Sequence, residues 1–135
     1  MTETPVTVLL VNWNCGEFLV RCVETVLRNE PSHPCHVFVV DNASTDRSLE
    51  LLLAYVAQSP AARASVEVLC HPENLGFARA VNQGLRATCS PFVFVLNPDT
   101  EVRPGAIDAL AGLWLGTPEP EPARRGYLVP TDLCR

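Results

Sequence analysis

The residues best suited to chemistry stand where an apolar run gives way to oxygen-bearing side chains. The run Phe92 to Leu96 is followed directly by Asn97, Pro98 and Asp99. A carboxylate two positions from an amide can hold a hard divalent cation, Mg²⁺ or Mn²⁺, beside a phosphate. Taken alone, the stretch is explained more simply by a strand that ends in an ordinary Pro-Asp turn. Residues elsewhere in the chain are needed to choose between a cation site and an ordinary turn.

Two other apolar runs also end in polar side chains. Val6 to Val11 leads into Asn12 to Asn14, and Val37 to Val40 leads into Asp41. In a parallel sheet the carboxyl ends of the strands share one edge, and ligands bind there. We therefore expect one crevice in which Asp41 accepts a hydrogen bond from a pyrimidine imide or a ribose hydroxyl. Asp99 would bind the cation that bridges a nucleoside diphosphate.

Helical periodicity between the apolar runs supplies the elements that must position these groups. Apolar residues recur at helical spacing in four segments, which are Phe18 to Leu27, Leu49 to Val56, Phe77 to Leu85 and Ile107 to Trp114. A further run, Val66 to Leu69, completes four strands. Strands that alternate with helices predict an α/β fold, with a mostly parallel sheet and helices on both faces. The Phe92 run is expected to be buried on both sides.

Local signals set the expected helix ends. Pro31 stops the first helix, and Pro60 closes the second. Ser44 or Asp46 is expected to cap the second helix, and Pro104 to lie in the first turn of the fourth. Beyond residue 116 the periodicity disappears, so we expect one domain over 1–116. The Pro-rich tail, 117–135, is expected to be poorly ordered, with at most a short strand at 127–129.

Composition excludes several classes of protein. The chain has 135 residues and a net charge of −5, without the basic stripe of a nucleic-acid-binding protein. We see no run long enough to span a bilayer and no signal peptide. The six cysteines form no Cys-x-x-Cys pair, and an even count permits disulfides. Without a signal peptide we expect reduced thiols and a cytoplasmic location. Dinucleotide-binding, P-loop and nucleophile-elbow motifs are absent.

Four segments carry sequence motifs whose order along the chain can be compared with that in known families. They are Val6 to Asn14, Val37 to Asp46, Pro72 to Gly84, and Leu96 to Gly105. They resemble the inverting glycosyltransferases of family 2, which have the GT-A fold, and the rhamnosyltransferase-like branch most of all. The resemblance covers the nucleotide-binding half of that fold. It implies a UDP- or dTDP-sugar donor, a divalent metal, and a saccharide or lipid-linked acceptor.

The resemblance also assigns roles to individual residues. Val11 and Trp13 would line the base, which Asp41 would bind. Asn74, Gly76, Asn82 and Asn97 would lie near the nucleotide, and Asp99 would be the direct metal ligand. Asn97 replaces an aspartate often found first in the metal motif, and Val81 stands where an asparagine is frequent.

The family pattern fades near Trp114, before the region that carries the acceptor site and the catalytic base. Inverting transfer needs a base to deprotonate the acceptor hydroxyl. We assign neither Glu119 nor Glu121 to that role, and the catalytic residues stay unknown. The alternative is a shortened, non-catalytic module that binds a nucleotide sugar or a partner. Without its C-terminal cover such a chain would expose apolar surface, which predicts marginal stability or a homo-oligomer.

Overall fold

The structure is a computed structural model that describes residues 6–28 and 35–115, with the backbone alone for 113–115. Its strands are β1 (Val6–Asn12), β2 (Cys35–Asp41), β3 (Val66–Cys70) and β4 (Phe92–Leu96). They pair in parallel, in the order β3-β2-β1-β4. The tail predicted for 117–135, with its short strand at 127–129, lies outside the described residues.

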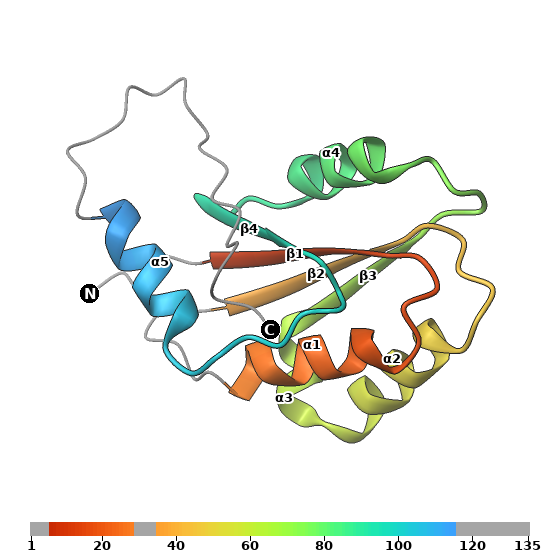
Figure 1. The fold of residues 1–135 in the computed structure, drawn as a ribbon, viewed down its shortest axis with the longest axis horizontal. Helices are drawn as coiled ribbons and strands as arrows, with labels where there is room; N and C mark the ends of the chain where they lie inside the picture. The colour runs from red at the N-terminus through yellow and green to blue at the C-terminus, as the bar shows by residue number, and fades with distance from the viewer. Residues whose placement is uncertain (1–5, 29–34, 116–135) are drawn as a thin grey trace.

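Helices cover both faces of this sheet. They are α1 (Glu17–Arg28), α2 (Ser48–Gln58), α3 (Pro60–Ser65), α4 (Phe77–Ala87) and α5 (Ala106–Leu115). In Figure 1, α4 lies above the sheet, whereas α1, α2 and α3 lie below it. The predicted α/β class with a parallel sheet is therefore confirmed. Within the described residues, no helix combines the length and the hydropathy that a membrane crossing requires.

The two central strands build a core on each face because their side chains alternate. Val8 and Leu10 of β1 point into the larger core, which α1, α2 and α5 also enter. Leu9 and Val11 point the other way, into a smaller core beneath Ala80 of α4. All seven residues of β1 are buried, as expected of a strand covered on both faces.

The strand Phe92–Leu96 differs from its prediction. It forms an edge of the described sheet, and it is not buried on both faces. Phe94 and Leu96 are buried in the larger core, but Val93 and Val95 are only half-buried. The reason is that α4 packs over β1 and β2, leaving the corresponding face of β4 partly open.

One helix boundary and one additional helix also differ from the predictions. Pro104 precedes α5, because Gly105 has a φ of 81° and the helix begins only at Ala106. The short helix α3 was not predicted. It follows α2 directly, and the Ser59 hydroxyl caps it by accepting the Ala62 N–H at 3.2 Å.

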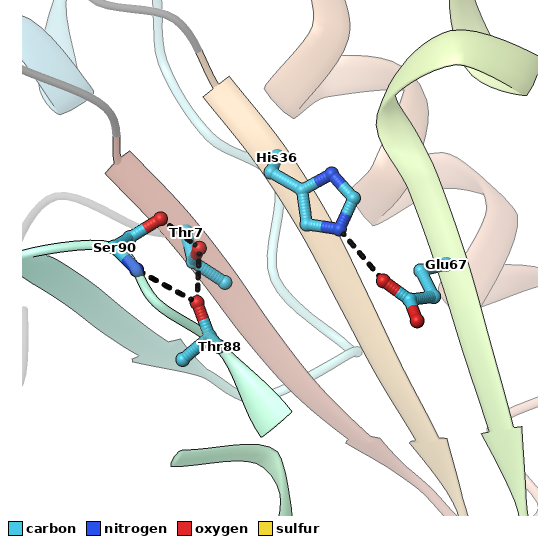
Figure 2. A network of polar contacts seen from close by, with 5 residues as sticks. All are labelled: Thr7, His36, Glu67, Thr88 and Ser90. Carbon is cyan, nitrogen blue, oxygen red and sulfur yellow. Dashed lines mark hydrogen bonds and ion pairs between the residues drawn. The ribbon is translucent and has the colours of Figure 1, made fainter. Parts of the chain in front are cut away.

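A hydroxyl cluster fastens the opposite, amino-terminal end of the sheet (Figure 2). The buried Thr7 Oγ1 lies 2.8 Å from Thr88 Oγ1 and 2.6 Å from Ser90 Oγ. Beside it, His36 Nε2 lies 3.2 Å from Glu67 Oε2 and joins β2 to β3. These groups satisfy one another, so we interpret the cluster as a clamp between β1 and the segment that enters β4.

A close approach of α4 to β1 predicts a large cost for a side chain at Gly84. A Cβ atom there would lie 2.3 Å from Leu9 Cδ1, and Leu9 is fully buried. Gly84→Val should therefore lower the free energy of unfolding by about 2 kcal/mol through overpacking. Urea denaturation measures this. Gly112→Ala in α5 is the control and should not destabilise, because an added Cβ atom there would meet no atom within 4 Å beyond its chain neighbours and its own helix backbone. Equal stability of Gly84→Val and wild type would contradict the packing.

Candidate functional site

The carboxyl ends of β1 and β2 are joined by their side chains. Asn12 and Asp41 are partners in the strand register, and the Asn12 amide donates to Asp41 Oδ1 at 2.7 Å. The same amide donates to Ser48 Oγ, in the first turn of α2, at 2.9 Å. Both Asn12 and Asp41 are buried. The two strand ends and the start of α2 therefore form one hydrogen-bonded unit.

Asp41 is the centre of this unit. Ser44 donates its hydroxyl to Asp41 Oδ1 at 2.7 Å and its backbone N–H to Oδ2 at 3.1 Å. The residue is only 3% exposed, and three of the roughly four lone-pair sites of the carboxylate are occupied. The predicted contact with a base remains a prediction, and it would have to use the site that is left.

A second set of hydrogen bonds links the loop after β1 to the loop after β2. Asn14 has a φ of 53°, in the left-handed region that asparagine tolerates. Its Oδ1 accepts the backbone N–H groups of Thr45 at 2.7 Å and Asp46 at 3.2 Å. In return, Asp46 Oδ2 accepts the N–H of Gly16 at 2.9 Å. We call these contacts among Asn14, Gly16, Thr45 and Asp46 the loop clip.

Asp46 also begins α2, as one of the two predicted caps. Its Oδ1 accepts the N–H of Ser48 at 3.0 Å, although the residue next to the helix is Arg47. Ser44, the other predicted cap, is engaged by Asp41 and caps nothing. The loop clip itself escaped sequence reasoning, since its partners are about thirty residues apart.

Acid should weaken the loop clip. The hydrogen bonds from the Ser48 side chain, then from backbone N–H groups, hold the pKa of Asp46 below its usual value. A lowered pKa in the folded state gives stability that is present above about pH 4, the unfolded value, and lost as the pH falls through the folded one. Asp46→Asn should therefore lower stability at pH 7 but less at pH 3. Urea denaturation at both pH values measures this, and an equal loss would contradict it.

The turn after β4 presents the predicted metal ligand to solvent. The Asn97 carbonyl accepts the N–H of Thr100 at 3.2 Å and its hydroxyl at 2.7 Å. Pro98 is buried, whereas the side chains of Asn97 and Asp99 are exposed. Beyond the turn, the Val102 N–H donates to Thr25 Oγ1 of α1 at 2.9 Å. The structural interpretation, a turn after the strand, and the functional one, a cation-binding site, are thus compatible. The turn is held by hydrogen bonds and leaves the side chains of Asn97 and Asp99 exposed.

A cavity of about 570 Å³ brings Asp99 together with the loop after β1. It is lined by Asn14, Cys15, Gly16, Glu17, Phe18, Arg21 and Asp99. Burial is the main cause that raises the pKa of the Cys15 thiol, and the charges of Asp99, Asp46 and Asp41 raise it further against a hydrogen bond to Trp13. Three carboxylates therefore act on this end of the cavity.

The donor set fits a divalent cation that is shared with a substrate. Within residues 6–28 and 35–115, no group of three or more His, Cys, Asp or Glu side chains could enclose a metal. Mg²⁺ needs no such cage, because it is commonly bound by one or two carboxylates, waters and substrate phosphates. The exposed carboxylate of Asp99 in an open cavity meets that requirement.

The segment before α4 holds the remaining predicted residues. Asn74 Oδ1 accepts the N–H of Gly76 at 2.8 Å, and Gly76 has a φ of 84°. Asn42, which sequence reasoning did not select, donates its amide to the Gly76 carbonyl at 3.2 Å. This contact ties the end of β2 to the start of α4. Asn82 is exposed on α4.

The two residues predicted to line a base lie in different environments. Trp13 is 56% exposed, so its indole ring is free to stack on a ligand. Val11 is 8% exposed and packs in the smaller core, so a base would reach its backbone rather than its side chain. The structure thus joins Asp41 to the loop after β1, which also lines the cavity beside Asp99. The side chain of Val11 packs in the smaller core under α4.

Comparisons with known proteins agree with this arrangement. The model of the family described as "Glycosyl transferase family 2" matches residues 7–119. The glycosyltransferase GlyG of Streptococcus pneumoniae is 29% identical over 106 residues, which are 78% of this chain and 33% of that protein. Chondroitin synthase of Escherichia coli is 28% identical over 103 residues, 76% of this chain and 14% of the synthase.

Solved structures show the same fold. The mannosyltransferase PcManGT from Pyrobaculum calidifontis, in complex with GDP-Man and Mn²⁺, has a TM-score of 0.74 and 24% identity. The match covers 87% of this chain and 34% of that one. TarS 1-349 of S. aureus in complex with UDP-GlcNAc has a TM-score of 0.67 and 18% identity, with coverage of 81% and 30%. The chain spans about a third or less of the length of these relatives.

Proposed function

The chain belongs to glycosyl transferase family 2, and from this premise we propose that it binds a nucleoside diphosphate sugar for transfer to an acceptor hydroxyl. The observation that carries the proposal is the cavity in which Asp99 and the loop after β1 meet. This cavity lies beside the Asn12–Asp41 unit, at the edge where parallel α/β sheets bind ligands. Its volume of about 570 Å³ is within the usual range for small-molecule sites.

The donor would lie across the strand ends. The exposed indole of Trp13 and the backbone of Val11 would contact the base, with Asp41 accepting a hydrogen bond from it. Asn74, Gly76, Asn82 and Asn97 would border the nucleotide. These assignments rest on the motif resemblance, and the shared edge of the sheet supports them. The complexes of PcManGT with GDP-Man and of TarS with UDP-GlcNAc suggest which donors to test.

Asp99 would hold a divalent cation, Mg²⁺ or Mn²⁺. Such a cation offsets the negative charge that develops on the departing nucleoside diphosphate. The chain would position the carboxylate of Asp99 through the turn that carries it. The hydrogen bonds from Thr100 to the Asn97 carbonyl close this turn. The loop clip likewise fixes the backbone of Gly16, which also lines the cavity. A site held in this way is formed before the donor arrives, which lowers the entropic cost of binding.

We further propose inversion at the anomeric carbon and a place in the rhamnosyltransferase-like branch. Asn97 supports the branch, since it stands where other members carry aspartate. None of the described carboxylates is assigned as the base that inversion needs. A domain over 1–116, a tail over 117–135 and a cytoplasmic location belong to the same proposal. None of the five described cysteines is in a disulfide bond, and reduced thiols are typical of the cytoplasm.

Calorimetric titration tests the proposal. The chain is titrated with UDP-, dTDP- and GDP-sugars, each with and without Mn²⁺, and donor hydrolysis is then assayed. We expect binding of at least one donor that strengthens with Mn²⁺. Absence of binding to every nucleotide would refute the site. Metal-dependent binding without hydrolysis, even when acceptor sugars are supplied, would favour the non-catalytic binding module.

A further inference from the structure

The cavity beside Asp99 contains one positive side chain that the motif resemblance leaves without a role. Arg21 is the only Lys, Arg or His among the seven residues that line it, where Glu17 and Asp99 are both acidic. Asp46 adds a further negative charge behind Gly16. A phosphate group that entered this cavity would meet mostly negative charge. The cation proposed at Asp99 would offset part of this negative charge, and a basic side chain in the cavity would offset more.

Two amide groups at the start of α1 are already engaged within the protein. The Gly16 N–H donates to Asp46 Oδ2 at 2.9 Å, and the Phe18 N–H donates to the Cys15 carbonyl at 3.1 Å. A carboxylate of the protein itself thus takes one N–H group at this helix start, where an anion could otherwise bind. Arg21 offers a charged donor group among the residues that line the cavity.

Arg21 is also uncommitted in the described part of the chain. It stands four residues after Glu17, a spacing at which helical ion pairs form. Yet the ion pairs among the described residues join Arg28 to Glu24, His36 to Glu67, and Arg47 to Glu50. The guanidinium is exposed and follows Phe18 by three residues, on the same face of α1. An exposed, unpaired guanidinium at a cavity wall matches the two-point geometry of a phosphate.

We propose that Arg21 is a phosphate-binding residue, which holds the diphosphate of the donor from α1, in the cavity that Asp99 also lines. The inference rests on the proposed function, because that function puts a diphosphate next to Asp99. Arg21 adds direct hydrogen bonds to phosphate oxygens, whereas Asp99 acts through a cation. The diphosphate is then held from α1 and from the turn after β4 at once, and both elements line the one cavity.

The test compares ligands that differ only in phosphate. Arg21→Gln should bind UDP or GDP, in the presence of Mn²⁺, about tenfold more weakly than wild type. Its affinity for uridine or guanosine should not change, and Arg21→Lys should recover part of the loss. Arg28→Gln, an exposed arginine of the same helix outside the cavity, is the matched control and should bind like wild type. Thermal melting checks that Arg21→Gln is folded.

The outcomes separate this inference from the proposed function. If wild type binds a nucleoside diphosphate and Arg21→Gln binds it equally well, the role of Arg21 is refuted and the proposed function stands. An equal loss of affinity for the nucleoside and for the diphosphate also refutes it, since a phosphate contact cannot act on a nucleoside. If wild type binds no nucleoside diphosphate, the proposed function and this inference fall together.

Discussion

Asp99→Ala should abolish the Mn²⁺ dependence of nucleotide binding. Asp99 is the one acidic side chain in the exposed turn after β4 that lines the cavity. Loss of outer partners of metal ligands already costs 10- to 100-fold in affinity, so we expect loss of the ligand itself to weaken Mn²⁺-assisted binding by about 100-fold or more. Titration of wild type and variant with UDP or GDP, with and without Mn²⁺, measures the difference.

Glu101→Ala is the matched control for Asp99. It removes an exposed carboxylate two residues away, from a residue that does not line the cavity. We expect it to keep the full response to Mn²⁺. Because the side chain of Asp99 is exposed, its replacement should leave the melting temperature nearly unchanged. If Asp99→Ala responds to Mn²⁺ as wild type does, Asp99 is not the ligand.

Asp41→Ala should destabilise the fold, because it removes the acceptor of several buried hydrogen bonds at once. The substitution leaves the Asn12 amide and the Ser44 hydroxyl and N–H without their acceptor, in a site where Asp41 is buried. Removing one partner from a buried charged network should lower the free energy of unfolding by about 3 kcal/mol. Urea denaturation at pH 7 measures the loss.

Two further variants serve as comparisons for the stability of Asp41→Ala. Asp41→Asn keeps the shape and one acceptor oxygen, so its loss should lie between wild type and Asp41→Ala. Glu73→Ala removes an exposed carboxylate near the start of α4 and should change stability by no more than about 0.5 kcal/mol. A stability loss for Asp41→Ala as small as that of Glu73→Ala would mean that the carboxylate does not hold the strand ends together.

Most elements of the fold could be predicted because their hydrophobic signal is long and regular. The predicted limits of the strand from Phe92 to Leu96 agree with β4. The six-residue helix α3 could not be found in this way, since Pro60 to Ser65 contains only small residues, one proline and one arginine. The edge position of β4 also has no local signal, because an apolar run looks the same at the centre and at the rim of a sheet.

In the candidate site too, some features can be predicted from the sequence and others cannot. That Asp41 and Asp99 follow strands can be seen in the sequence, and so can the shared edge that parallel pairing imposes. The side-chain partners cannot be seen. The hydrogen bonds of Asn12 to Asp41, of Asn14 to Thr45 and of Asp46 to Gly16 each span about thirty residues and depend on loop geometry. A charge without a motif, such as Arg21, becomes noticeable only when the cavity around it is known.

The loop clip has a consequence for anyone who alters this protein. Each of its two loops supplies both donors and acceptors to the other, with Asn14 accepting from Thr45 and Gly16 donating to Asp46. An insertion or a graft in one loop therefore removes the partners of the other, and the two behave as a single unit of redesign. A library that varies 13–16 alone would mostly sample broken clips. A library that exchanges 13–16 and 42–47 together would keep the contacts of Asn12 with Asp41 and Ser48 while the residues that line the cavity change.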